Sequence, residues 1–145
     1  GSKNGGPPTE AIVFFNSALA QNFAWRIKQT GQLVSKMRYL AAPWIGLLKD
    51  DVWLANARHA NAQARKLGQG FQQLGIQPAL GIESNMVFAR LDQREADALE
   101  TLGWDFYPFQ LDDEIAYRFV CNWSTTDQAV DDLLEDAQTI ASRTK

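Results

Sequence analysis

The chain has 145 residues, of which 46% are hydrophobic and five are tryptophan, so it suits one folded domain with an apolar core and not a disordered segment. Its formal net charge of -3, with acidic and basic residues interleaved, argues against a nucleic-acid-binding surface, which would need a basic patch. The single cysteine, Cys121, cannot form an internal disulfide, and no apolar run is long enough to span a bilayer, so we expect a cytoplasmic protein.

The first third of the chain is predicted to contain one strand and two helices. Residues 11–15 are an apolar run typical of a short buried strand. Asn16 follows this run and suits the N-cap of a helix that carries Lys28. A second helical pattern extends over residues 32–48, where Pro43 should kink the helix or end its first segment.

The clearest predicted element is a long helix that starts after Asp50 and Asp51. Its apolar residues recur at alternating four- and three-residue steps, which places them in one stripe over about six turns. Small alanines in this stripe allow another helix or backbone to approach closely. Gly75 is predicted to end the helix. The stripe consists of Trp53, Ala57, Ala60, Ala64, Leu67, Phe71 and Leu74.

The remaining residues alternate between strand and helix signals, which indicates a compact sheet covered by two helices. Strands are predicted at residues 76–80, 86–91, 104–109 and 114–123. Asp92 with Glu95 resembles a capping box that starts one helix. Thr125 with Gln128 forms a similar pattern at the start of the last helix.

Two basic residues are candidates for chemistry. Lys3 lies in a glycine-rich turn, where missing side chains would let a bulky planar group approach its amine, which can form a Schiff base with an aldehyde. The alternative is a lysine in a frayed terminus. Arg118 interrupts an apolar strand, so it either lies on a solvated face or binds an anion such as a carboxylate, which its planar fork suits.

The single histidine and the single cysteine are interpreted as structural. His59 has no paired Cys/His spacing around it that could complete a metal site. Cys121 is expected to act as a small buried hydrophobe on its strand. No metal site is therefore predicted.

Five segments resemble, in order and at compatible spacing, the low-specificity L-threonine aldolase family, in the branch that includes phenylserine aldolase. The segments are GSKNG with EAIVFFN, RIKQTGQLVSKMRYLAA, WLANARHANA, ESNMVF and YRFVCNWSTT. Together they cover essentially the whole chain.

The resemblance implies an α/β fold, that of the PLP-dependent transferases (aspartate aminotransferase-like, fold type I), with this chain as its C-terminal portion. Residues 1–30 would end the large domain, residues 31–75 would form the long interdomain helix and its neighbours, and residues 76–145 would form a small α+β domain. Lys3 would be the catalytic residue that holds pyridoxal 5'-phosphate, and Lys28 would serve the cofactor phosphate of a neighbouring subunit. Arg118 would bind the α-carboxylate of the substrate.

The implied activity is PLP-dependent retro-aldol cleavage of L-threonine, L-allo-threonine or related β-hydroxy-α-amino acids to glycine and an aldehyde. The expected assembly is a homodimer or homotetramer, with no nucleic-acid or membrane partner. Because the family's large domain supplies most cofactor contacts, the missing N-terminal half would be required and the chain alone is expected to be inactive. Two alternatives remain open: a phenylserine aldolase or β-eliminating lyase of the same fold, or a non-catalytic α+β binding or regulatory module.

Overall fold

The structure, a computed structural model, describes residues 1–143, which divide between Trp53 and Leu54 into two compact units. Among these residues, no helix has the length and apolar character that crossing a bilayer requires. The domain boundaries predicted at residues 30 and 75 stay predictions.

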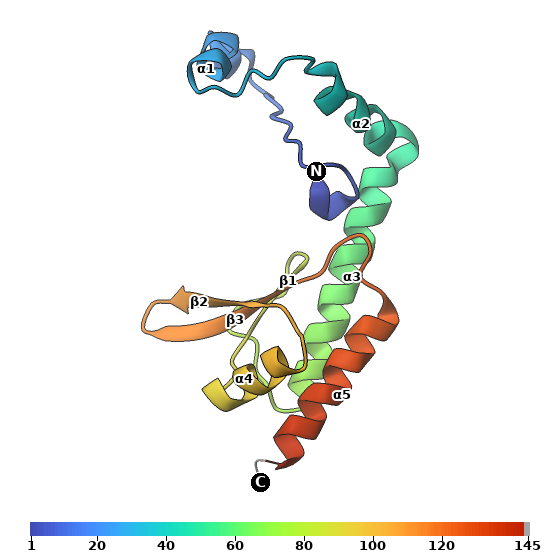
Figure 1. The fold of residues 1–145 in the computed structure, drawn as a ribbon, viewed down its shortest axis with the longest axis vertical. Coiled ribbons are helices and arrows are strands. Elements are labelled where there is room, and N and C mark those ends of the chain that lie inside the picture. The colour runs from blue at the N-terminus through green and yellow to red at the C-terminus, as the bar shows by residue number, and fades with distance from the viewer. Residues whose placement is uncertain (144–145) are drawn as a thin grey trace. The chain divides into compact units, whose positions relative to one another are not determined.

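Unit 1 (residues 1–53) consists of short helices joined by irregular segments (Figure 1). The 3₁₀ helices are η1 (Ser2–Asn4), η2 (Ser17–Ala20) and η3 (Lys49–Asp51), and the α-helices are α1 (Phe23–Gln29) and α2 (Arg38–Leu48). The strand predicted at residues 11–15 is wrong, because this segment has no regular structure in the chain. A strand needs a neighbour for its backbone hydrogen bonds, and the described part of unit 1 contains no other strand.

The first two α-helices begin at later residues than predicted, because residues before them have left-handed backbone conformations. The Asn16 side chain does act as a cap, but its Oδ1 accepts from Ala18 N (3.0 Å) at the start of the short η2. Asn22 then adopts a left-handed conformation (φ 59°), so α1 starts only after it. Lys36 is also left-handed (φ 60°), which excludes the residues before it from α2. Pro43 lies inside α2 and does not end it.

Unit 2 is a three-stranded antiparallel sheet packed against helices (Figure 1). The long helix α3 (Val52–Gln73) begins at the unit boundary, and Gly75 follows it in a left-handed conformation (φ 87°), as predicted. The other elements are β1 (Met86–Ala89), α4 (Gln93–Thr101), β2 (Tyr107–Leu111), β3 (Glu114–Val120) and α5 (Asp127–Arg143). The strand order is β1-β3-β2, so β3 is the central strand.

The core of unit 2 lies between one face of this sheet and the helices. Phe71 of α3 is fully buried, and its ring centroid lies 5.2 Å from that of Phe119 on β3. Burying a side chain of this size stabilises the fold by about 1.5–3 kcal/mol. The core comprises Ala64, Leu67, Phe71, Ile76, Val87, Ala89, Leu91, Ala96, Leu99, Phe106, Tyr117, Phe119, Cys121, Val130, Leu133 and Ala137.

Two of the predicted strands in unit 2 need correction. Residues 76–80 form only an isolated bridge between Pro78 and Ala89. Two backbone hydrogen bonds flank this bridge, from Ala79 N to the oxygen of Phe88 (2.7 Å) and from Arg90 N to the oxygen of Gln77 (3.0 Å). The strand predicted at residues 104–109 begins at Tyr107 and continues to Leu111, which aligns it with the central strand.

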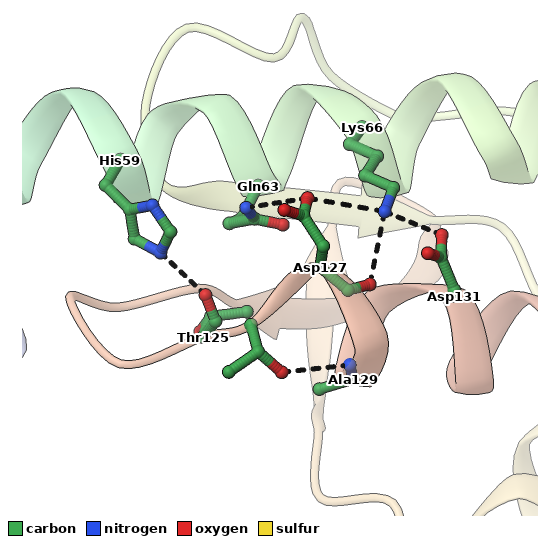
Figure 2. Close-up of polar contacts among 8 residues, drawn as sticks. His59, Gln63, Lys66, Thr125, Asp127, Ala129 and Asp131 are labelled. Atoms are coloured by element: carbon green, nitrogen blue, oxygen red, sulfur yellow. Dashed lines mark hydrogen bonds and ion pairs between the residues drawn. The ribbon is translucent and has the colours of Figure 1, made fainter.

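Hydrogen bonds and ion pairs connect α3 to the start of α5 (Figure 2). Lys66 Nζ lies 2.7 Å from Asp131 Oδ1 and 3.4 Å from Asp127 Oδ1, and Gln63 Nε2 donates to Asp127 Oδ1 (3.2 Å). These contacts lower the pKa of Asp127, chiefly through the Gln63 hydrogen bond and then through Lys66. His59 Nε2 donates to the backbone oxygen of Thr125 (2.6 Å), which agrees with the structural role predicted for it.

Candidate functional site

Arg118 lies on the sheet face opposite the core. Its neighbours on β3, Tyr117 and Phe119, are buried in the core, while Arg118 between them is half-buried on the other side. The alternation predicted for this strand is therefore confirmed. Alternation and strand pairing place seven residues on this opposite face, named the Arg118 face: Met86, Phe88, Tyr107, Phe109, Ala116, Arg118 and Val120.

Strand pairing surrounds Arg118 with aromatic side chains. In the register of the sheet, Arg118 is directly opposite Phe88 on β1 and Tyr107 on β2. Side chains of directly paired residues lie on the same face, so both rings lie on the face that carries Arg118. Its Cζ lies 5.5 Å from the centroid of the Tyr107 ring, within the range of a cation–π contact.

The guanidinium of Arg118 is incompletely satisfied. Its Nε is buried and has no hydrogen-bond partner within the described residues. Buried polar groups in proteins are usually hydrogen-bonded, and leaving one unpaired costs about 1–3 kcal/mol. A cation held on an apolar, aromatic face in this way is suited to bind an anion.

Arg90, in the same unit, is an arginine whose guanidinium nitrogens all donate hydrogen bonds. Its Nε and Nη2 donate to the two carboxylate oxygens of Glu114 (2.9 and 2.7 Å), and its Nη1 donates to the backbone oxygen of Pro78 (2.9 Å). This bidentate pair lowers the pKa of Glu114, mainly through the hydrogen bonds. Arg90 is therefore a structural residue, and the contrast indicates a different role for Arg118.

Lys3 lies in a compact turn in which Gly5 takes a left-handed conformation that favours glycine. Backbone N–H groups of Asn4 and Gly6 both donate to the oxygen of Gly1 (3.0 Å each), and Gly5 is left-handed (φ 86°). A Cβ on Gly6 would lie 2.9 Å from Leu47 Cδ1. These contacts hold the backbone of the turn that carries Lys3.

The side chain of Lys3 is exposed, and no hydrogen bond or ion pair within the described residues engages its amine. The turn is also tied to the rest of unit 1, because Asn4 Nδ2 donates to the backbone oxygen of Trp53 (2.8 Å). An available amine on an anchored turn is what covalent capture of an aldehyde requires.

The third predicted site residue, Lys28, is exposed in the last turn of α1. Figure 1 draws α1, the helix that carries Lys28, away from the N-terminus. Arg118 belongs to unit 2, whereas Lys3 and Lys28 belong to unit 1.

The aromatic neighbours of Arg118 were not among the site residues expected from the sequence. Tyr107 and Phe109 are two residues apart, a spacing that puts them on one face of a strand. The spacing therefore indicates that the two rings share a face of the strand. Whether that face is the one that carries Arg118 depends on the strand register, which the sequence does not state.

The chain is similar in sequence to two known proteins. A low specificity L-threonine aldolase of Pseudomonas aeruginosa is 45% identical over 97% of this chain, and one of a second Pseudomonas strain is 42% identical over 98%. The chain is homologous to part of a low-specificity L-threonine aldolase. It spans about two fifths of the length of these relatives, 40% and 41% respectively. No protein-family model matches the chain.

A solved structure supports the same relationship. The structure of Leishmania major threonine aldolase superposes with a TM-score of 0.77 at 27% identity, over 88% of this chain and 38% of that one. This match confirms the predicted fold class, and the helices with a small antiparallel sheet are consistent with the C-terminal portion of such a protein.

Proposed function

We propose that these residues are the C-terminal part of a pyridoxal-phosphate-dependent aldolase. The enzyme would cleave L-threonine, L-allo-threonine or a related β-hydroxy-α-amino acid to glycine and an aldehyde. The observation that carries the proposal is Arg118, which has an unpaired buried Nε on an aromatic sheet face in a chain homologous to threonine aldolases. A cytoplasmic homodimer or homotetramer remains part of the same proposal.

The residues present fit the cofactor. Lys3 offers an amine without a partner in the described residues, on a turn whose backbone is held by hydrogen bonds. We assign Lys3 to hold the cofactor and Lys28 to serve the cofactor phosphate of a neighbouring subunit. When bound, pyridoxal phosphate supplies an electron sink for charge that develops at the substrate Cα.

Arg118 would bind and orient the substrate. Its planar guanidinium can donate two parallel hydrogen bonds to the α-carboxylate, which fixes the direction of the substrate as well as its position. Orientation decides which bond at Cα is placed to break, so this contact contributes to the rate and not only to binding. The remaining parts of the site would come from the rest of the longer protein.

Variants of Arg118 in the full-length protein test this role. Loss of a bidentate charged contact costs about 2–4 kcal/mol, so Arg118→Ala should lower kcat/KM for L-threonine by roughly thirty- to a thousandfold. Arg118→Lys should recover little, because an ammonium lacks the planar fork. Cofactor absorbance should persist in both variants, since the carboxylate belongs to the substrate.

Arg90→Lys is the matched control, because it changes an arginine of the same unit whose donors are already occupied. It should leave kcat/KM close to that of the wild type. Unchanged kcat/KM in Arg118→Ala would make Arg118 an ordinary surface charge. Assays with L-phenylserine beside L-threonine separate the proposed aldolase from a phenylserine-specific enzyme by the preferred substrate. Identification of both products separates it from a β-eliminating lyase, because only the aldolase releases glycine and an aldehyde.

A further inference from the structure

The Tyr107 ring is the described contact that restrains the Arg118 guanidinium. No ion pair and no hydrogen bond within the described residues engages that guanidinium, whereas its Cζ lies 5.5 Å from the ring centroid. Tyr107 is placed there by the sheet, because it is the residue directly opposite Arg118 on β2. The contact therefore follows from the register and not from a mobile loop.

An aromatic ring is a suitable partner for an arginine that must bind a carboxylate. A protein carboxylate in this position, like Glu114 beside Arg90, would occupy the donors and neutralise the charge. A ring face attracts the cation through its quadrupole and leaves the N–H donors of the guanidinium edge available. Tyr107 can thus hold the orientation of Arg118 without competing with the substrate.

The opposite side of Arg118 is also confined. Phe88 is its direct partner on β1, and the Phe88 ring lies edge-to-face on that of Phe109 with centroids 5.0 Å apart. Ala116 between these strands is fully buried, although it lies on the Arg118 face. The Phe88 side is thus already packed, which leaves the Tyr107 side to set the orientation of the guanidinium.

We propose that Tyr107 is a positioning residue, whose ring holds the Arg118 guanidinium in the orientation that receives the substrate carboxylate. The inference rests on the proposed function of Arg118 and adds to it a residue that acts through Arg118. It also predicts that the ring and not the hydroxyl of Tyr107 matters.

The test is a double-mutant cycle in the full-length enzyme, with Tyr107→Leu, Tyr107→Phe and Arg118→Ala. Cation–π contacts of this kind correspond to about two- to thirtyfold, so Tyr107→Leu should lower kcat/KM by that factor, mostly through KM. Tyr107→Phe should stay within about twofold of the wild type, because the ring remains. In the Arg118→Ala background, Tyr107→Leu should cause no further loss.

Phe109→Leu is the matched control, since it removes a ring two residues away on the same face, which packs against Phe88 and makes no cation–π contact with Arg118 within the described residues. Its effect should add to that of Arg118→Ala, in contrast to the effect of Tyr107→Leu. A readout independent of turnover is the rate at which phenylglyoxal modifies Arg118 in the cofactor-free protein, followed by peptide mass spectrometry. The rate should rise in Tyr107→Leu and not in Tyr107→Phe.

The outcomes separate the two proposals. If Arg118→Ala has no effect on kcat/KM, the proposed function of Arg118 fails. If Arg118→Ala is impaired but Tyr107→Leu is not, or Tyr107→Leu loses as much in the Arg118→Ala background, the positioning role alone is overturned. Equal losses in Tyr107→Phe and Tyr107→Leu would also overturn it, because the hydroxyl would then be the active group.

Discussion

Burial determines the chemistry of Cys121. The thiol lies in the core of unit 2, immediately after β3, and desolvation raises its pKa to about 11. The thiolate is the reactive form of cysteine, so a raised pKa together with burial makes this residue inert at neutral pH. The sequence predicted this role from the strand alternation alone, and the structure confirms that Cys121 is buried.

We predict that Cys121 resists alkylation in the folded protein. A pKa of about 11 instead of 9.0 leaves a thiolate fraction roughly a hundredfold smaller at pH 8, before the steric effect of burial is counted. Iodoacetamide labelling of the Cys121 peptide, followed by mass spectrometry, should be slow in buffer and complete in denaturant. Labelling in buffer as fast as that of the denatured chain would contradict the burial of this thiol.

At the scale of elements, caps decide where two helices of unit 2 begin. The capping box predicted for α4 is present, because Glu95 N donates to Asp92 Oδ1 (2.8 Å) and Asp92 N donates to Glu95 Oε2 (2.9 Å). The predicted cap of α5 is wrong by one residue. Thr126 Oγ1, and not Thr125, accepts from a backbone N–H of the first turn, that of Ala129 (3.1 Å).

The Thr125 hydroxyl accepts a hydrogen bond within the turn that precedes α5. It accepts from the backbone N–H of Asn122 (2.9 Å), while its backbone oxygen accepts from His59. Two adjacent threonines can fill either role, and the sequence alone does not say which of them faces the helix. The helix itself was predictable from its apolar periodicity.

We predict that Thr126→Ala destabilises the start of α5. Loss of a side-chain cap typically costs about 1 kcal/mol, and Thr126→Ser should retain most of the stability because it keeps the hydroxyl. Hydrogen exchange at the Ala129 amide in the full-length protein reports this directly, and exchange should accelerate in Thr126→Ala. Equal exchange in Thr126→Ala and the wild type would exclude Thr126 as the cap.

Long-range pairing is the part of the fold that the sequence predicted least well. Residues 11–15 and 76–80 have strand-like composition, yet neither forms a strand, because neither finds a complete ladder within the described residues. The helices were predicted more accurately, since periodicity and caps are local signals. The same limit applies to the site, where Arg118 was identifiable but its partner Tyr107 required the register.

At the scale of the whole molecule, unit 1 exposes large apolar side chains. Val13, Phe15 and Trp25 are 70%, 100% and 66% exposed, respectively. Contiguous exposed apolar surface commonly marks an interface. In the proposed enzyme, the rest of the longer protein would cover these residues and complete the cofactor site, so the 145 residues alone are expected to be inactive.

In the proposed pyridoxal-phosphate-dependent aldolase, Lys3 is the residue that holds the cofactor. The most direct test is to reduce the full-length holoprotein with sodium borohydride, which fixes the cofactor to the lysine that holds it, and to map the modified peptide by mass spectrometry. We expect the label on Lys3, and we expect Lys3→Ala to abolish it. A label on another lysine, or a holoprotein in which no lysine is labelled, would contradict the assignment of Lys3.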